Sequence, residues 1–483
     1  MAEEAKYVED IIDQEDNFSR WYNQVVRKAE LADYAPVRGC MIIRPYGYAI
    51  WEHIQRLLDA RFKETDVVNA YFPLLIPRSF LEREAEHIEG FAPELAWVTR
   101  GGGEELEEPL AIRPSSETII SHSFAKWIQS YRDLPLLINL WNNAMRWEKR
   151  TMLFLRTTEF LWQEGHTAHR TVEEAEERTL MMLEDYRAFA EEDLAIPVIA
   201  GRKSENEKFA GALRTYSIEA MMGDGKALQA GTSHNLGTNF ARGFDMKYLD
   251  ADGQCKYCAT TSWGLSTRTI GGVIMVHGDS SGLILPPHVA PYQVVLVPIW
   301  RKEADKAAVG ELVTRVEKML KGKVRLKVDL SENTPGWKFN EWELRGVPVR
   351  MEIGPRDAQS NSVVLVRRDN RVKEIVSVGA LEARLPVLLE EMQQALRQRA
   401  LEFREQHTYK TDSYEEFKQI IAEQRGFVRV KWAEDSAAEL AVKEQTKATL
   451  RVIPFDQPEG GVQGKCIYSG KAATCEAIFA RAY

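Results

Sequence analysis

Two short arginine-containing segments carry side chains suited to phosphate chemistry. The first, 142–148, contains Arg146 and Glu148, and the second, 154–160, ends in Phe160. If the segments are strands joined by a loop, period-two alternation places Arg146 and Glu148 on one face. A guanidinium fork matches the oxygens of an α-phosphate or a carboxylate, and an aromatic ring can stack on a base. An isolated Arg-x-Glu is more often a surface ion pair, so the surrounding sequence has to decide.

Common nucleotide-binding signatures are absent from the chain. No G-x-x-x-x-G-K-[ST] occurs, because the nearest candidate ends Gly464-Lys465-Cys466 with the wrong spacing. No G-x-G-x-x-G follows a strand either. The arginine segments therefore stay the candidates for contacts with phosphate.

The composition limits the class of protein. The chain has 483 residues, of which 44% are hydrophobic and 28% charged, which excludes disordered and collagen-like chains. About 150 residues per domain predicts about three domains.

No apolar run approaches the roughly 20 residues of a membrane span, and the acidic segment 1–10 lacks the apolar core of a secretory signal. Five scattered cysteines fit a reducing, cytoplasmic setting. The net charge of −9 means that a nucleic acid must be bound by local basic patches.

The elements that would position the arginines are visible as periodic patterns. Apolar residues recur at helical spacing over 48–62, and a β-rich run, 67–77, which ends in prolines, follows. A capping box of Thr171 and Glu174 opens a further helix. The segment 260–275 mixes small and β-branched residues.

The pattern changes after Leu283–Pro287, where strands and helices begin to alternate. The expected elements are strands at 293–298, 325–328, 347–353 and 363–366 and helices at 304–320 and 385–404. This alternation predicts a small α/β domain with a mixed sheet. A polar linker, 405–412, and a capping box of Ser413 and Glu416 then open a final module. We therefore expect domains at 1–285, 286–405 and 406–483.

Several motifs together resemble those of a known family. The block around Arg146 resembles motif 2 of class II aminoacyl-tRNA synthetases, Pro73 the motif 1 proline, and 262–268 motif 3 with its arginine, Arg268. Further blocks resemble prolyl-tRNA synthetases in particular, at 113–118, 160–166, 229–234, 336–344 and 354–357. The resemblance runs in order from about Asp16 to Tyr483, so the chain is identified as a member of that family.

The resemblance implies a fold and a reaction. The fold class is α/β: an α+β catalytic domain with the antiparallel class II sheet flanked by helices, an α/β anticodon-binding domain with a mixed sheet, and a small α+β C-terminal module. The reaction joins L-proline to ATP, with loss of pyrophosphate, and then transfers proline to the 3′ end of tRNA(Pro). Because the proline carboxylate is already ionised, catalysis reduces to alignment and charge stabilisation. The resemblance also implies a homodimer through the Pro73 region, a Mg²⁺ ion on the phosphates, and no membrane partner.

Site residues are carried over position by position. Arg146 and Arg268 are the expected catalytic residues. The expected proline-binding residues are Ser115, Glu117, Arg146, Trp162, Glu164, His166 and His234. The expected ATP-binding residues are Arg146, Glu148, Arg156, Thr157, Phe160, Gln229, Thr232, Ser266 and Arg268. Glu117 would pair with the proline ammonium, and Ser115 stands where the family usually has Thr. The expected anticodon-binding residues are Glu343, Arg350, Arg356 and Asp357.

The C-terminal module departs from its relatives, which commonly hold zinc through four cysteines. The corresponding positions here are Ala433, Ala438, Cys466 and Ser469. One thiolate cannot complete a tetrahedral site, so we expect no structural zinc and no metal ligands. The module would then depend on an apolar core, with expected members Phe427, Val430, Leu440, Leu450, Ile453 and Phe479. We also expect an ordered tail ending at Tyr483.

Three further expectations complete the sequence prediction. Only about a hundred residues separate Phe160 from Ser262, so we expect no editing insertion, as in the archaeal and eukaryotic type of architecture. Cys255 and Cys258 have no second pair at zinc-site spacing and are expected at a hairpin tip. His288 stands where relatives often carry arginine, and we assign it no catalytic role.

Two alternatives stay open on the sequence alone. The chain could be a class II synthetase for another small amino acid; the pocket of Glu117, Trp162 and His166, together with the segment 354–357, is what discriminates between the two. It could also be a paralogue that has become a regulatory or RNA-binding protein. Such loss of activity usually removes the phosphate-binding arginines, yet Arg146 and Arg268 are both present.

Overall fold

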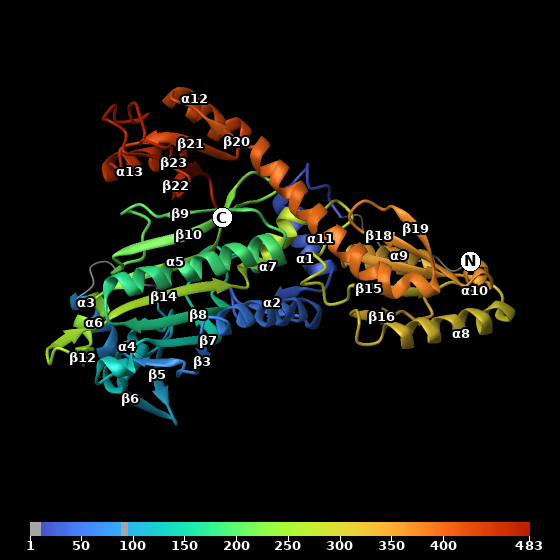
Figure 1. The fold of residues 1–483 in the computed structure, drawn as a ribbon, viewed down its shortest axis with the longest axis horizontal. Coiled ribbons are helices and arrows are strands. Elements are labelled where there is room, and N and C mark those ends of the chain that lie inside the picture. The colour runs from blue at the N-terminus through green and yellow to red at the C-terminus, as the bar shows by residue number, and fades with distance from the viewer. Residues whose placement is uncertain (1–10, 88–94) are drawn as a thin grey trace.

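The computed structural model describes residues 11–87 and 95–483. The acidic segment 1–10, in which the sequence predicts no secretory signal, lies outside the described residues. Figure 1 shows a large sheet at the centre, a smaller α/β domain at one end and a C-terminal module above the sheet. The long helix α11 (Leu381–Gln406) runs from the smaller domain to the C-terminal module (Figure 1).

The central sheet has 11 strands in the order β20-β21-β23-β22-β9-β10-β11-β14-β8-β7-β3. Neighbours are antiparallel except β3 with β7 and β20 with β21, which are parallel. Its strands are β3 (Val68–Asn69), β7 (Leu136–Met145), β8 (Glu159–His169), β9 (Val198–Arg202), β10 (Arg214–Met221), β11 (Ala227–Gly237), β14 (Ala259–Ser266), β20 (Thr408–Lys410), β21 (Phe427–Trp432), β22 (Thr449–Pro454) and β23 (Cys475–Ala480). The last four belong to the C-terminal module, so the module extends the central sheet.

Helices cover one face of this sheet. The side chain of Thr171 accepts a hydrogen bond from the backbone N–H of Glu174, which confirms the predicted start of α5 (Val172–Ala188). Helix α5 packs on β11 and β14. The indole of Trp263 on β14 lies against Gly165, where a Cβ would come within 2.0 Å of the ring, so no larger residue fits there. The remaining helices of this region are α1 (Phe18–Lys28), α2 (Pro45–Lys63), α4 (Glu117–Trp127), α6 (Asn239–Gly243) and α7 (Arg268–His277).

Three smaller sheets surround the central one. They comprise β1 (Ala32–Tyr34) with β2 (Met41–Ile43), β4 (Leu75–Pro77) with β6 (Glu104–Ile112) and β5 (Trp97–Gly101), and the hairpin of β12 (Lys247–Leu249) with β13 (Cys255–Tyr257). Helix α3 (Arg78–His87) follows β4. The expectation of Cys255 and Cys258 at a hairpin tip is wrong, because Cys255 begins the returning strand β13 and pairs with Leu249. The tip itself consists of residues 250–254.

The second domain is built on a five-stranded sheet in the order β16-β15-β17-β18-β19. Its elements are β15 (Val294–Pro298), α8 (Glu303–Leu320), β16 (Leu326–Val328), α9 (Pro335–Leu344), β17 (Val349–Ile353), α10 (Pro355–Ser360), β18 (Ser362–Arg367), β19 (Lys373–Ser377) and α11. Strand β15 is parallel to β16 and β17, whereas β18 is antiparallel to its neighbours, which confirms the mixed sheet. Helix α11 begins at Leu381 rather than at the predicted Leu385, because Leu381 is also buried in the core of this domain. The helix contains Pro386 in its second turn.

The C-terminal module packs α12 (Tyr414–Gln419) and α13 (Ser436–Thr446) on its four strands. Most expected core residues are buried, namely Phe427, Val430, Leu450, Ile453 and Phe479. The expectation for Leu440 is wrong, because its side chain is 55% exposed. Helix α13 buries Ala438, Val442 and Thr446, which follow one another at i, i+4 spacing, and Leu440 points away from that stripe. The tail is ordered: the N–H of Tyr483 donates to the backbone oxygen of Ala227 at the start of β11, at 3.1 Å.

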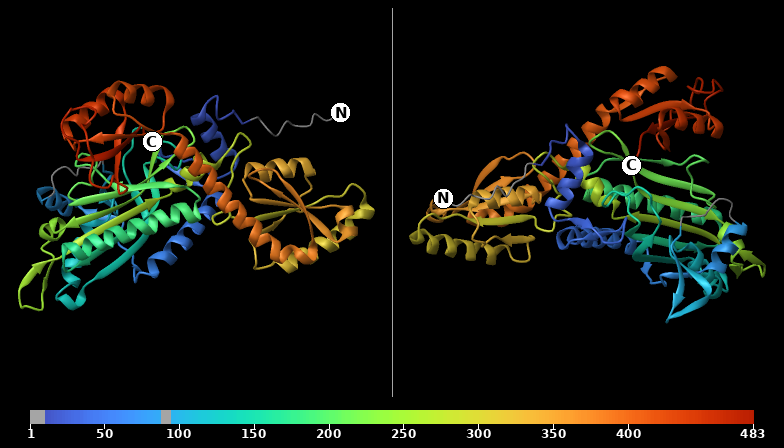
Figure 2. Two further views of the ribbon diagram at one scale, coloured as in Figure 1. Left: turned by 45° about the horizontal axis from the view of Figure 1, so that its top comes forward. Right: turned by 180° about the vertical axis from the view of Figure 1, so that it is seen from behind.

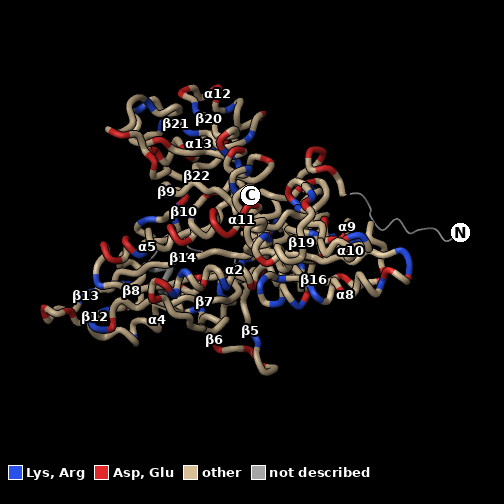
Figure 3. Tube along the Cα trace, turned by 45° about the vertical axis from the view of Figure 1, so that its right-hand side comes forward, with Lys and Arg blue, Asp and Glu red and all other residues tan. Residues whose placement is uncertain are grey.

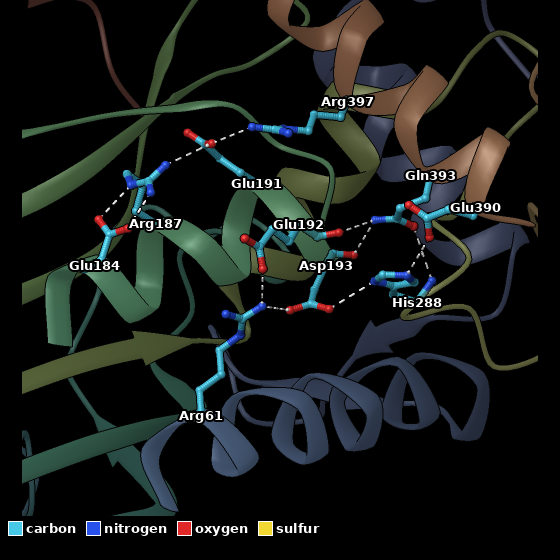
Figure 4. Close-up of polar contacts among 10 residues, drawn as sticks. All are labelled: Arg61, Glu184, Arg187, Glu191, Glu192, Asp193, His288, Glu390, Gln393 and Arg397. Atoms are coloured by element: carbon cyan, nitrogen blue, oxygen red, sulfur yellow. Dashed lines mark hydrogen bonds and ion pairs between the residues drawn. The ribbon is translucent and has the colours of Figure 1, made fainter. Parts of the chain in front are cut away.

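A polar contact joins the central region to α11 (Figure 4). A π-helical turn, Phe189–Asp193, ends α5 and presents Asp193, which accepts from Arg61 on α2 at 2.9 Å and contacts the Nδ1 of His288 at 3.0 Å. Gln393 on α11 donates to the backbone oxygens of Glu192 at 2.7 Å and Asp193 at 3.0 Å. His288 thus has a structural place between domains.

Charged residues of both signs are interspersed along the whole trace (Figure 3). A nucleic-acid partner would therefore have to be held by local groups of basic residues, as the net charge of −9 also requires. Among the described residues, no helix is both long enough and apolar enough to cross a membrane.

Candidate active site

A cavity of about 370 Å³ opens on the face of the central sheet opposite α5. On β8, Trp162 and Glu164 line the cavity, whereas Gln163 between them points the other way and is hydrogen-bonded to Tyr186 of α5. The same alternation on β11 brings Thr232 and His234 into the cavity. The structure thus collects side chains from β8, β10, β11 and β14 and from the β7–β8 loop.

The cavity contains all but one of the residues expected to bind proline and ATP. Those that line it are Ser115, Glu117, Arg146, Glu148, Arg156, Thr157, Phe160, Trp162, Glu164, Gln229, Thr232, His234, Ser266 and Arg268. The exception is His166, which is buried behind Glu164 and does not line the cavity. Arg113, from the same sequence block as Glu117, also lies outside, where it donates to the backbone oxygens of Phe72 and Asn143 and so ties the Pro73 segment to β7.

Two half-buried guanidinium groups give the cavity a positive character. Arg146 follows β7 and donates through Nε to the backbone oxygen of Pro114 at 3.1 Å. Its guanidinium lies 5.4 Å from the ring centroids of both Phe160 and Trp162, an arrangement that favours a cation. Arg268, the first residue of α7, donates through Nε to the backbone oxygen of Leu155 at 2.9 Å. Burial and the charge of Arg146 lower the pKa of Arg268 to about 10, so Arg268 stays charged at neutral pH.

A second feature is the fully hydrogen-bonded carboxylate of Glu164. It accepts from Asn142 Nδ2 at 2.8 Å and from the N–H of Ser116 at 3.1 Å, and it contacts His166 Nε2 at 3.0 Å. Burial opposes ionisation, but these hydrogen bonds outweigh it and hold the pKa of Glu164 below its ordinary value. Although burial disfavours its charged form, the bond to Glu164 raises the pKa of His166. His166 therefore orients Glu164 from behind.

Glu117 differs from Glu164 because part of its carboxylate has no partner. It is the first residue of α4 and is 7% exposed. Among the described residues, none offers a hydrogen bond to its Oε2, which is fully buried. Buried carboxylate oxygens are normally paired. Since Glu117 lines the cavity, the unpaired oxygen indicates that a ligand with a donor or cationic group belongs beside it.

The sequence analysis missed one wall of the cavity. Glu207 and Phe209, in the segment between β9 and β10, line it together with Thr215. The ring of Phe209 lies 4.7 Å from that of His234, and Thr215 Oγ1 is hydrogen-bonded to His234 Nδ1 at 3.0 Å. Burial and the nearby charges of His166 and Arg146 lower the pKa of His234 to about 3, so its ring is neutral. The available signal was a lone aromatic residue, Phe209, within a polar segment.

The residues expected to read the anticodon fall into two places. Glu343 and Arg350 line a cavity of about 210 Å³ in the five-stranded domain, which also contains Arg367, Arg371 and Lys373. Arg356 and Asp357 begin α10 instead, where Asp357 Oδ2 accepts from the N–H of Gly354 at 2.7 Å. The structure therefore brings two of the four together.

Comparisons with known proteins identify the chain. Residues 97–277 match the family "tRNA synthetase class II core domain (G, H, P, S and T)", 293–388 match "Anticodon binding domain", and 414–483 match "Prolyl-tRNA synthetase, C-terminal". The chain is 59% identical over 473 residues to a proline–tRNA ligase of Roseiflexus castenholzii, covering 97% of this chain and 98% of the relative. It belongs to the prolyl-tRNA synthetases.

Other matches agree with this family. A proline–tRNA ligase of Symbiobacterium thermophilum is 55% identical over 490 residues, covering all of both chains. Among solved structures, the prolyl-tRNA synthetase of Cryptosporidium parvum, complexed with halofuginone and AMPPNP, superposes with a TM-score of 0.93 at 44% identity, covering 98% of this chain and 99% of that one. The synthetase is thus a class II proline–tRNA ligase, which activates L-proline with ATP and transfers it to tRNA.

Proposed function

We propose that the cavity holds proline at its Glu117 side and ATP at its Arg268 side, with Arg146 between them. The observation that carries this assignment is the buried, unpaired oxygen of Glu117, which matches the ammonium of a free amino acid. Trp162 and His234 would enclose the pyrrolidine ring, and a neutral His234 suits an apolar ligand. Ser115 and Glu164 would line the same proline side of the cavity, and His166 would hold the carboxylate of Glu164 in place.

The ATP side would use the remaining lining residues. Arg146 would contact both the proline carboxylate and the α-phosphate, Arg268 the γ-phosphate, and Phe160 the adenine ring. Further contacts would come from Glu148, Arg156, Thr157, Gln229, Thr232 and Ser266. Because the attacking carboxylate is already ionised, no general base is needed, and two fixed guanidinium groups stabilise the charge that develops on the phosphate.

A Mg²⁺ ion would accompany the ATP phosphates. Among the described residues, no group of three or more His, Cys, Asp or Glu side chains could hold a metal. The Mg²⁺ ion would therefore take its ligands mostly from phosphate oxygens and water. The ion would neutralise phosphate charge, while the arginines orient the α-phosphate.

The anticodon would be read in the five-stranded domain. Glu343 lines the cavity there and can accept hydrogen bonds from the N–H donors of guanine, and Arg350 beside it can contact phosphate or base. Arg356 and Asp357 at the start of α10 would act from a separate place. We also propose the functional division into 1–285 for catalysis, 286–405 for the anticodon and 406–483 for the C-terminal module.

The synthetase would have the archaeal and eukaryotic type of architecture, without an editing domain. Support comes from the C-terminal match at 414–483 and from the segment between Phe160 and Ser262, which forms α5, β9 to β11, α6 and the β12–β13 hairpin. A missing methylene gives only about 1–3 kcal/mol of discrimination, so some alanine would be activated. Hydrolysis of alanyl-tRNA(Pro) by the purified synthetase would contradict this proposal.

We further propose a zinc-free homodimer that works in the cytoplasm. Cys466 is buried in the apolar core of the module, and Ala438 packs there as well. Val68 and Tyr71, next to Pro73, are 59% and 75% exposed, as expected of a dimer contact. Elemental analysis should show far less than one zinc per chain, and light scattering should give twice the chain mass of 55.1 kDa.

Proline-dependent exchange of pyrophosphate into ATP tests the central assignment. Arg146→Ala should lower the rate at least about a thousandfold, because it removes a charge that acts on the transition state. Glu117→Gln should instead raise the KM for proline, by about tenfold or more, with a smaller change in the KM for ATP. Arg150→Ala, in the same loop but outside the cavity, is the matched control. Normal exchange by Arg146→Ala would refute the assignment.

A further inference from the structure

The C-terminal module contacts the wall of the cavity that the sequence analysis missed. This wall, residues 203–213, connects β9 to β10 and is called the 203–213 loop here. Its inner side presents Glu207 and Phe209 to the cavity, where Phe209 packs on His234. Its outer side faces α13 of the module. Figure 1 shows the module directly above β9 and β10, the strands that the loop connects, and both views of Figure 2 show the module, in red, beside the green part of the central sheet.

The two halves of the loop are held by different parts of the molecule. The second half is attached to the central sheet, since the N–H of Phe209 donates to Thr215 Oγ1 at 2.9 Å and that of Leu213 to the oxygen of Asn235 at 2.8 Å. The first half begins at Lys203, whose N–H donates to the backbone oxygen of Thr215 on β10 at 2.8 Å, and after Lys203 it is attached to α13. Ser204 Oγ donates to Glu439 Oε1 at 2.8 Å, and Asn206 Nδ2 donates to the backbone oxygen of Ser436 at 2.9 Å.

The loop is also joined to the module through charge. Lys443 on α13 donates to Glu207 Oε1 at 3.3 Å, so one end of this pair lines the cavity and the other belongs to the module. At the base of the loop, the ammonium of Lys203 donates to Glu219 at 2.8 Å and to the backbone oxygen of Arg451 on β22 at 2.7 Å. The loop therefore has module contacts from its first residue to Glu207.

Glu439, the hydrogen-bond partner of Ser204, is an unusual residue to find buried in a helix. It is 5% exposed, and burial, together with the charge of Glu207, raises the pKa of its carboxyl group. A buried carboxyl group is costly unless it is paired, and an apolar side chain would stabilise the helix more readily. What Glu439 provides in return is the hydrogen bond that fixes Ser204, three residues before Glu207.

We propose that Glu439 is a positioning residue for the proline side of the active site. By holding Ser204, it keeps the first half of the 203–213 loop in place, and so sets Glu207 and Phe209 against the pocket of His234. The C-terminal module thereby contributes to proline binding without touching the substrate. This inference rests on the proposed placement of proline beside His234.

Pyrophosphate exchange on the full-length protein tests the proposal, with the KM values for proline and ATP measured separately. Glu439→Ala and Ser204→Ala should each raise the KM for proline roughly five- to tenfold, since each removes one buried hydrogen bond. The KM for ATP should stay within about twofold, because Arg268 and Gln229 lie on other elements. Glu439→Gln keeps an acceptor for Ser204 and should restore a KM near that of the unchanged protein. Glu444→Ala, an exposed residue of the same helix, is the matched control.

The outcomes separate this proposal from the one on which it rests. If the proline pocket is placed correctly, Trp162→Ala should raise the KM for proline. An unchanged KM for proline in this variant would show that the proposed proline site is wrong. If Trp162→Ala raises it and neither Glu439→Ala nor Ser204→Ala does, the positioning role alone is refuted. An equal rise in both KM values, or a failure of Glu439→Gln to restore proline binding, would also refute it. Should Glu439→Ala fail to fold, Ser204→Ala, on the catalytic side of the same bond, decides the question.

Discussion

The catalytic domain is joined to its two neighbours by contacts of different kinds. The C-terminal module continues the central sheet through β22 and β9, and behind this pairing Glu219 is bonded to Lys203 and Arg451. The side chains of these three residues are 2%, 0% and 9% exposed for Lys203, Glu219 and Arg451. The anticodon-binding domain is joined partly through α11, where half-exposed ion pairs lie beside the buried Gln393, and partly through Arg368, which donates to both carboxylate oxygens of Asp279. Figure 4 shows the contact through α11.

The ion pairs of the module junction and the ion pairs beside α11 lie in different dielectric environments. At the α11 junction, the side chains of His288 and Arg397 are 37% and 42% exposed, so water and salt weaken their ion pairs. At the module junction, the ions are inside the protein, and losing one partner leaves a charge that water cannot reach. We infer that the ion pairs of the module junction contribute more to stability than the ion pairs beside α11. Substitutions in the two junctions should therefore differ in their effect on stability.

The largest effect is expected from Glu219→Gln. It leaves Lys203 and Arg451 as two buried cations, which should lower the free energy of unfolding by about 3–5 kcal/mol. The midpoint of the first transition in urea, followed by fluorescence, measures this loss. The matched control is Glu434→Gln, which breaks a half-exposed pair with Arg202 at the rim of the same junction. Equal losses in the two variants would show that the buried cluster has no special role.

A smaller effect is expected from Gln393→Ala at the α11 junction. Gln393 is 1% exposed, and its amide donates to two backbone oxygens of the π-helical turn. Its removal leaves both carbonyls unpaired, at a cost of about 1–3 kcal/mol. Hydrogen exchange should become faster in the turn and in α11, and stay unchanged in β22. Faster exchange in β22 would contradict the view that the two junctions are independent.

His288 should make the same junction depend on pH. The hydrogen bond with Asp193, helped by the charge of Glu390, raises the pKa of His288 above its ordinary value of 6.5, although burial opposes the charge. The stabilisation is therefore complete below pH 6.5 and is lost as the pH rises through the raised pKa. Because the ring is partly exposed, the effect should stay below about 1 kcal/mol. The unchanged protein should have a higher melting temperature than His288→Gln at pH 6, and the two should converge by about pH 8.5. A difference in melting temperature that grew with pH would contradict the stabilising role of protonated His288.

The junctions also show where sequence patterns stop being informative. Periodicity and capping boxes predict α5 and α12, because these signals are local in the sequence. The family motifs are local as well, and every residue that they assign to proline or ATP lines the cavity except His166. The pairing of β22 with β9 joins residues about 250 positions apart, and no local pattern records it. The same holds for the 203–213 loop, whose irregular backbone has no period. His166 lies on the same face of β8 as Glu164, as expected, yet the carboxylate of Glu164 lies between His166 and the cavity. Leu440 shows that an apolar residue on a short helix need not face the core.

The smallest effect is expected from Arg397→Ala, which removes an ion pair from the exposed side of the α11 junction. Arg397 Nη2 lies 2.9 Å from Glu191 Oε2, but Glu191 also pairs with Arg187, within the same helix region, at 3.1 Å. Its carboxylate therefore keeps a partner, and the loss should stay below about 0.5 kcal/mol. The difference in melting temperature between the variant and the unchanged protein should shrink further in about 0.5 M salt, since exposed charges are screened over a few ångströms there. Removing Arg187 as well should cost more than the two single losses combined, because only then is Glu191 unpaired. A large, salt-independent loss from Arg397→Ala alone would place this pair with the buried cluster of Glu219, and the contrast between the junctions would not hold.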